Sequence, residues 1–225
     1  MYFKIKAVIF DMDGVITNTM PDHYKAWRRV LLDAGVAITQ REIYLREGQP
    51  GNITVREILK EKGFKYSEAL MKDILARKEA LFKKIVKRRF VPGARGFLHF
   101  LKRRGFVLGL VTGTACHEVE RILPVGLLKL FSVRITGCEV KKGKPDPEPY
   151  LKALKKLKIK PHDAVVIENA PFGILSAKRA GLECLALETS LPKSFLKEAD
   201  LISHSYADLR KRVCFEKNET PNSGD

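Results

Sequence analysis

The chain has 225 residues, of which 45% are hydrophobic and 30% charged, and its formal net charge is +16. A chain of this length accommodates one sizeable core, or a core with a small inserted domain. No apolar stretch approaches the roughly 18 residues of a membrane span, and the first residues lack the pattern of a signal peptide. These features exclude a membrane-spanning protein and predict a cytoplasmic one.

The positive charge is spread along the whole chain. Basic blocks such as 83–84, 87–89 and 141–144 attract anions, which include phosphorylated metabolites and nucleic acids. The blocks are not interleaved with aromatic residues, so we expect a solvated basic surface and no specific nucleic acid partner. A basic nucleic-acid-binding protein remains an alternative. The four cysteines are scattered, with no C-x-x-C pair, and are expected to be reduced thiols.

The N-terminal part of the chain predicts a strand followed by a helical segment. Residues 1–16 contain a short apolar run bounded by a turn signal, which is typical of a strand buried on both faces. From about residue 20 to about residue 88 the apolar positions recur at helical spacing, as in Trp27, Val30 and Leu31. We therefore expect an insertion of about four helices here.

After residues 91–93 the pattern changes to alternating strands and helices. The expected elements are a helix over 96–104, strands over 106–111 and 133–135, a helix over 147–157 that begins at Asp146 and Pro147, a strand over 164–167, a helix over 172–180 and a strand over 183–187. This alternation implies right-handed β-α-β crossovers and a parallel sheet, so the fold class is α/β. The polar residues 216–225 are expected to form a loose tail.

The most informative motif is Ala-Val-Ile-Phe-Asp-Met-Asp-Gly-Val at residues 7–15. Two carboxylates at the end of a buried strand repel each other, and a bound cation such as Mg²⁺ would offset that repulsion. Open α/β sheets bind their ligands at the carboxyl ends of the strands. Asp11 and Asp13 are therefore a candidate catalytic pair, although Asp-x-Asp-Gly is also an ordinary turn.

Three further motifs fall near predicted strand ends. Thr112-Gly113-Thr114 offers a hydroxyl and backbone N–H groups to phosphate oxygens, or forms a simple turn. Lys144 stands in a loop stiffened by prolines, or is a solvated surface lysine. Glu168-Asn169 follows an apolar strand as Asp11 does, or caps the helix that follows.

The four motifs in this order resemble the haloacid dehalogenase superfamily of phosphotransferases. The resemblance covers roughly residues 5–210 and is closest to phosphatases and β-phosphoglucomutases with a helical cap. It implies a Rossmann-like, doubly wound parallel sheet core with an inserted α-helical cap domain. The domains are expected at 1–18 and 89–215 for the core, and at 19–88 for the cap.

The resemblance also implies a role for each motif. Asp11 is expected to be the nucleophile that forms an aspartyl-phosphate, and Asp13 the acid and base of the two steps. Lys144 and Thr112 are expected to stabilise the transferring phosphoryl group, with Gly113 beside it in the substrate site.

By the same resemblance, the cofactor is Mg²⁺, and its ligands are a side-chain oxygen of Asp11, the backbone carbonyl of Asp13 and the fourth motif, Glu168 and Asn169. Many relatives have an acid where this chain has Asn169. Either Asn169 coordinates as a neutral ligand, or Glu168 carries that side of the metal alone.

Within the predicted cap, His23 and Lys78 match substrate-facing residues of the β-phosphoglucomutases, although each is also an ordinary residue for a helix. Residues 45–51, which include Gly48, correspond to the cap loop that selects the substrate. The mutase has an arginine for a second phosphate where this chain has Gly51, which argues against a mutase because a mutase must hold a bisphosphate at both ends.

We therefore expect a Mg²⁺-dependent phosphatase that acts on a small phosphorylated metabolite, such as a sugar phosphate or phosphoglycolate. A β-phosphoglucomutase-like phosphotransferase is the alternative enzyme. The protein is expected to be a monomer or a weak homodimer.

Overall fold

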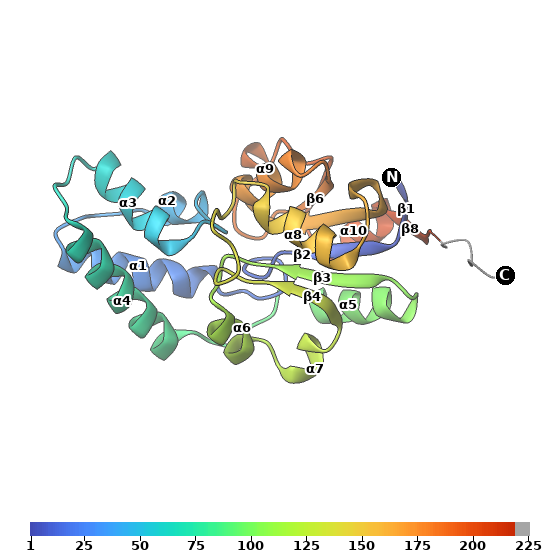
Figure 1. Cartoon of the computed structure of the whole chain (residues 1–225), viewed down its shortest axis with the longest axis horizontal. Coiled ribbons are helices and arrows are strands. Elements are labelled where there is room, and N and C mark those ends of the chain that lie inside the picture. Colours follow the sequence, from blue (N-terminus) through green and yellow to red (C-terminus); the bar gives the residue numbers. More distant parts are fainter. Residues whose placement is uncertain (219–225) are drawn as a thin grey trace.

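The computed structural model describes residues 1–218, and within them six strands form one fully parallel sheet (Figure 1). In spatial order these strands are β4 (Phe131–Ile135), β3 (Val107–Val111), β2 (Ala7–Phe10), β5 (Ala164–Glu168), β6 (Glu183–Leu187) and β7 (Leu201–Ser203). The chain runs outward from β2 to β4 and then returns to the other side of β2, so the direction of winding reverses beside β2. The expected α/β class and doubly wound parallel sheet are confirmed.

Alternation along β2 explains why both faces of the sheet are buried. Val8 and Phe10 belong to one hydrophobic cluster, whereas Ala7 and Ile9 belong to another. Since successive side chains of a strand point to opposite faces, β2 needs an apolar layer on each side. This is the reason for its uninterrupted apolar sequence.

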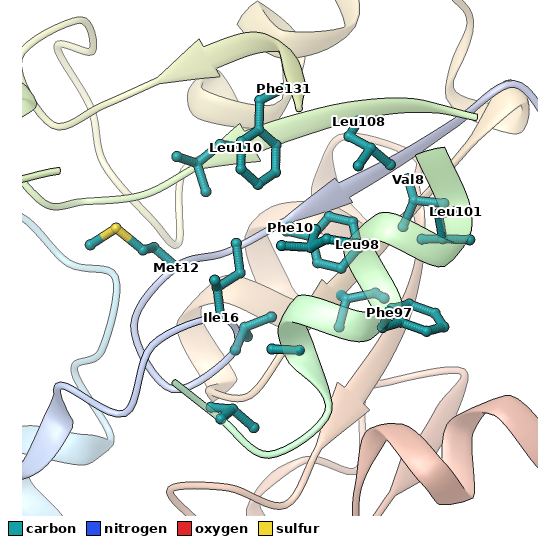
Figure 2. Close-up of a cluster of buried hydrophobic side chains, with 14 of the residues drawn as sticks. Val8, Phe10, Met12, Ile16, Phe97, Leu98, Leu101, Leu108, Leu110 and Phe131 are labelled. Atoms are coloured by element: carbon teal, nitrogen blue, oxygen red, sulfur yellow. The ribbon is translucent and has the colours of Figure 1, made fainter. Parts of the chain in front are cut away.

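The described helices supply these two layers. The first cluster is completed by α5 (Ala94–Arg103), α6 (Cys116–Ile122), α7 (Val125–Leu128) and α10 (Tyr206–Arg212), and the second by α8 (Glu148–Leu157) and α9 (Pro171–Arg179). Figure 2 shows how Phe97, Leu98 and Leu101 of α5 lie against Phe10 and Leu108 of the sheet. These α5 positions recur at helical spacing, so one helix face meets the sheet.

Between residues 20 and 85 the structure describes four helices, which lie at one end of the sheet (left in Figure 1). They are α1 (Met20–Asp33), α2 (Gln40–Tyr44), α3 (Gly51–Glu61) and α4 (Glu68–Ile85). Trp27, Leu31, Ile58 and Ile74 belong to a third hydrophobic cluster, which these helices share with Leu191. The expected helical insertion is therefore present.

The two chain segments that join these helices to the sheet lie side by side. The backbone N–H of Asn18 donates to the carbonyl of Arg89 over 2.9 Å, and Thr17 forms a β-bridge with Phe90. We place the domain boundaries at these segments as a proposal, with the cap at 19–88 and the core on either side.

Some local expectations need correction. The strand expected within residues 1–16 consists of β1 (Tyr2–Ile5) and β2, and the helix expected at 96–104 begins at Ala94. The expected loose tail is wrong at Glu216 and Lys217, which lie in β8 (Cys214–Lys217) and pair in parallel with β1. The exposed backbone edge of β1 provides the hydrogen bonds that order this short polar strand. Residues 219–225 lie outside the described part of the chain.

None of the helices described within residues 1–218 is long and apolar enough to cross a membrane.

Candidate active site

Three strands bring the first, second and fourth motifs to one edge of the sheet. In the register of β2 with its neighbours, Phe10 pairs with Leu110 and with Ile167. Asp11 therefore leaves the sheet beside Glu168, and its N–H donates to Ile167 over 3.0 Å. This edge adjoins the point where the winding of the sheet reverses, which is where open α/β sheets bind their ligands.

Lys144 joins the first and fourth motifs. Its Nζ lies 2.6 Å from Asp11 Oδ1, 2.6 Å from Glu168 Oε1 and 3.2 Å from the carbonyl oxygen of Val111. All of these side chains are buried, and Tyr150 of α8 also donates to Glu168 Oε1 over 2.7 Å. Lys144 is thus held in place by charge and by hydrogen bonds from both sides.

Burial and charge act against each other at this pair. Burial lowers the pKa of Lys144, but Asp11 and Glu168 outweigh it and raise the pKa above its ordinary value of 10.5. Burial raises the pKa of Asp11 well above 3.8, Lys144 opposes this rise and Glu168 adds to it. The charge on Asp11 therefore depends on its contact with Lys144.

Asp13 lies in a different environment, at the junction of the sheet and the cap. Its Oδ1 accepts a hydrogen bond from the Thr19 hydroxyl and lies 3.4 Å from His23 Nε2. Its Oδ2 accepts from Thr114 over 2.7 Å and from Thr112 over 3.4 Å. Burial raises the pKa of Asp13, but the hydrogen bonds and charge of His23 and the hydroxyls lower it to about 2.

A tight turn places the fourth motif against the first. Gly14 has a φ of +79°, and a Cβ at that position would lie 2.0 Å from Asn169 Nδ2. A side chain at residue 14 would therefore displace Asn169. This is the structural reason for glycine after the two aspartates.

The oxygens at this turn fit a hard cation. Asp11 Oδ2 and Asn169 Oδ1 are buried and have no hydrogen-bond partner among the described residues. Both oxygens of Glu168 are used, Oε1 by Lys144 and Tyr150 and Oε2 by the backbone N–H of Asn169. Of the two possibilities that the sequence leaves open, this geometry favours Asn169 as a neutral ligand.

The candidate metal ligands are oxygens of different chemical kinds. Within residues 1–218, no group of three His, Cys, Asp or Glu side chains is arranged to hold a metal by itself. An amide oxygen and a carboxylate oxygen, with the backbone carbonyl of Asp13 that the family resemblance adds, are hard ligands that suit Mg²⁺.

A cavity of roughly 250 Å³ lies between the cap and the sheet edge. The four residues predicted to contact substrate, His23, Gly48, Lys78 and Gly113, all line it, together with Asp13. Thr112 is not among the lining residues within the described chain, and its hydroxyl lies 3.4 Å from Asp13 Oδ2. Its expected contact with a phosphate oxygen remains a prediction.

Lys78 is the buried cation of this cavity. Its Nζ lies 4.8 Å from the centre of the Phe82 ring and 5.5 Å from that of Trp27. Burial lowers its pKa, and Glu118 partly opposes that change. The His23 ring also stacks on Phe82, with 3.9 Å between the two ring centres.

The cap loop at residues 45–51 covers the deeper part of the site. Gly48 has a φ of +81°, and a Cβ there would lie 2.7 Å from Lys144 Cδ. A Cβ on Gly113 would lie 2.7 Å from the carbonyl oxygen of Gly48. Glycine at both positions lets the loop approach the sheet edge closely.

Arg46 lines the cavity, but both arginines that could replace a second phosphate grip, Arg46 and Arg56, pair with acids of the cap. Arg46 donates to the carbonyl of Glu42 over 2.8 Å and pairs with Glu61, whereas Arg56 pairs with Glu68 at 3.2 Å. Gly51 lines the cavity and offers no charge. Lys78 is then the cap cation best placed to meet a substrate.

Several site residues were not predicted. Thr19 and Thr114 bind Asp13, and Tyr150 binds Glu168. Glu47 accepts a hydrogen bond from Asn169 Nδ2 over 2.9 Å. The second threonine of Thr-Gly-Thr was a usable signal for Thr114, but no local pattern marks the other three.

Comparison with known proteins relates this arrangement to a family. Residues 5–181 match the family model described as haloacid dehalogenase-like hydrolase. A phosphorylated carbohydrates phosphatase from Thermotoga maritima is 38% identical over 186 residues, which cover 80% of this chain and 83% of the relative. Validoxylamine A 7'-phosphate phosphatase from Streptomyces hygroscopicus subsp. limoneus is 32% identical over 206 residues, which cover 91% of this chain and 96% of the relative. Among solved structures, β-phosphoglucomutase from Clostridium difficile matches with a TM-score of 0.79 and 25% identity, covering 92% of this chain and 96% of the other.

Proposed function

Since the chain belongs to the haloacid dehalogenase-like hydrolase family, and two of its relatives are named as phosphatases of phosphorylated compounds, we propose that it is a Mg²⁺-dependent phosphatase. Its substrates are small phosphomonoesters of the sugar phosphate or phosphoglycolate type. The reaction passes through a phosphorylated Asp11.

In the first step Asp11 attacks the phosphorus atom and the bond to the leaving oxygen breaks. Asp11 attacks through Oδ1, which lies 2.6 Å from the Lys144 ammonium, and the unpartnered Oδ2 is left for the cation. Asp11 is 2% exposed, so the residues packed around it must move aside to admit the phosphate. Lys144 also offsets the negative charge that gathers on the phosphoryl oxygens.

Asp13 carries the proton in both steps. With a pKa of about 2 it is ionised in the free enzyme, and a phosphate dianion bound beside it favours the protonated form. Asp13 takes this proton up from solvent through the cavity that it lines. Asp13 then protonates the leaving oxygen, and in the second step it takes a proton from the water that releases phosphate.

Asp11 Oδ2 and Asn169 Oδ1, with the backbone carbonyl of Asp13, are the groups that would hold Mg²⁺. When bound, the cation supplies positive charge to the phosphoryl oxygens and orients the phosphate for attack.

The observation that carries this proposal is the difference between the two aspartates. Asp11 is held by one ammonium and keeps a free oxygen, whereas Asp13 is surrounded by hydroxyls and an imidazole. One environment suits a nucleophile and the other suits a proton carrier. Release of inorganic phosphate from a panel of phosphorylated metabolites, with and without Mg²⁺, tests the proposal. Absence of Mg²⁺-dependent release from every member would refute it.

A β-phosphoglucomutase-like activity is the second candidate, because His23 and Lys78 line the cavity and a solved mutase shares the fold. We expect phosphate release and no conversion of β-glucose 1-phosphate to glucose 6-phosphate, even with the bisphosphate primer. The reason is that Gly51 carries no charge and that Arg46 and Arg56 are bound to acids. Efficient isomerisation with little phosphate release would establish the mutase instead.

Lys78→Ala is expected to reduce kcat/KM for the best sugar phosphate by about 10-fold or more, and for an aryl phosphate by much less. Lys78 faces the part of the cavity that holds the leaving group, so its loss affects selection among substrates. Lys84→Ala, an exposed lysine of the same helix, is the control and should change neither value. Equal losses for both substrates would place Lys78 at the phosphoryl group.

Asp13→Asn is expected to reduce kcat/KM for a sugar phosphate by about 10²–10⁴-fold, since the leaving alkoxide needs a proton. An aryl phosphate has a better leaving group, so its kcat/KM should fall less. Steady-state kinetics on both substrates measure the difference. If the two losses were equal, Asp13 would not be the proton donor of the first step.

A further inference from the structure

Glu47, in the cap loop between α2 and α3, reaches the sheet edge. It is 5% exposed, and its Oε1 accepts a hydrogen bond from Asn169 Nδ2 over 2.9 Å. A Cβ on Gly14 would lie 2.8 Å from the same Oε1. The carboxylate therefore lies over the turn that follows the first aspartate pair, although it comes from the cap.

The charge of this region is unbalanced. Asp11, Asp13, Glu47 and Glu168 are all buried, and Lys144 pairs with two of them, Asp11 and Glu168. Within residues 1–218, no lysine, arginine or histidine forms an ion pair with Glu47. A buried carboxylate without a cation is costly, and the cost falls when a cation binds beside it.

Three chain segments each contribute one buried oxygen without a hydrogen-bond partner among the described residues. Asp11 Oδ2, Asn169 Oδ1 and Glu47 Oε2 are each buried, and none has a hydrogen-bond partner in the described part of the chain. The Asn169 amide group donates to Glu47 and to Ser190, at 2.9 and 2.8 Å, which fixes its orientation. An aspartate at residue 169 could make neither donation and would face Glu47 with a like charge.

We propose that Glu47 supplies, from the cap, the negative charge that the cation site lacks because residue 169 is asparagine. The proposal rests on the Mg²⁺ dependence proposed above. Asn169 and Glu47 act together. The amide group of Asn169 donates to Glu47 Oε1 and leaves Glu47 Oε2 for the cation.

One consequence concerns the cap. Glu47 belongs to the loop that packs against Lys144 and Gly113, so its charge reaches the cation site when that loop is seated. Cation binding then favours the seated loop, and by linkage the seated loop raises the affinity for the cation. The cation site is complete in the form of the protein that shields the nucleophile from water.

Calorimetric titration with Mg²⁺, in the absence of any substrate, tests directly whether the charge of Glu47 contributes to cation binding. Glu47→Gln keeps the shape of the side chain and removes its charge, and we expect a 10–100-fold weaker Kd. Glu79→Gln is the matched control, because Glu79 lines the same cavity but is exposed. Its Kd should stay within about two-fold of the wild type.

The double variant Glu47→Gln/Asn169→Asp moves the charge from the cap to the sheet edge. The glutamine amide can then donate to the new aspartate, so we expect the Kd to return to within about five-fold of the wild type. Thermal unfolding without metal checks folding, and Glu47→Gln should be at least as stable as the wild type because a buried unpaired charge is gone.

The outcomes separate the two proposals. If the wild type binds Mg²⁺ and Glu47→Gln binds it equally well, the role of Glu47 is overturned and Mg²⁺ dependence stands. If Glu47→Gln weakens binding but the double variant does not recover it, Glu47 acts by docking the loop, and charge compensation is overturned. If the wild type binds no Mg²⁺, both proposals fall.

Discussion

Replacement of Asp11 by asparagine is expected to reduce turnover of every substrate by at least about 10⁴-fold, because an amide cannot form the acyl-phosphate. The variant should fold normally. Asparagine has nearly the same shape, and the change removes a carboxylate whose pKa burial raises well above its ordinary value. Steady-state phosphate release measures the loss, and thermal unfolding verifies the fold.

The matched comparison for Asp11→Asn is Asp13→Asn, which changes the neighbouring acid in the same way. Asp11→Asn should abolish aryl phosphate hydrolysis, whereas Asp13→Asn should retain part of the first step. A correctly folded Asp11→Asn protein with near-wild-type turnover would refute the proposed nucleophile.

Replacement of Lys144 by methionine has the second largest expected effect, because it acts on both activity and stability. It leaves Asp11 and Glu168 buried side by side without their shared cation. Removal of one partner from a buried ion pair typically costs about 3–5 kcal/mol of unfolding free energy. Loss of the charge that stabilises the phosphoryl group should reduce kcat by about 10²–10³-fold in addition.

The same variant should show a characteristic pH dependence. Without Lys144, no ammonium lowers the pKa of Asp11, so this pKa rises further in the folded state. Folded Asp11 then keeps its proton above pH 3.8, where the unfolded chain loses it. A folded-state pKa above the unfolded one means that stability falls as pH rises between the two values. The stability deficit of Lys144→Met relative to the wild type should therefore be larger at about pH 8 than at about pH 5.

Urea unfolding at the two pH values measures this deficit. Lys142→Met, at an exposed position of the same loop, is the control and should show little deficit at either pH. A deficit for Lys144→Met that is the same at both pH values would mean that Asp11 does not depend on Lys144 for its charge.

The arrangement of the sheet follows from local patterns. Uninterrupted apolar runs at 7–10, 107–111 and 164–167 indicate strands buried on both faces, and parallel strands align their carboxyl ends. The common location of Asp11 and Glu168 at one sheet edge could thus be predicted. Short edge elements such as β7 and β8 could not, because three or four residues carry too little periodicity.

The contacts between cap and sheet edge have a different origin. Glu47 and Asn169 are separated by 122 residues and meet because Gly48 lets the loop approach Lys144. Neither residue has a local pattern that specifies the other. The family resemblance implies that a charge is missing at residue 169, and the tertiary structure is needed to identify the carboxylate that lies beside it.

Detection of a phosphorylated enzyme tests the central claim most directly. Wild-type protein mixed with a sugar phosphate and Mg²⁺, quenched rapidly in acid and digested, should yield a peptide around Asp11 that carries one phosphoryl group. The adduct should be absent in Asp11→Asn and should be removed by hydroxylamine, which cleaves acyl-phosphates. A substrate turned over with no adduct at any quench time, or with the phosphoryl group on another residue, would contradict the account.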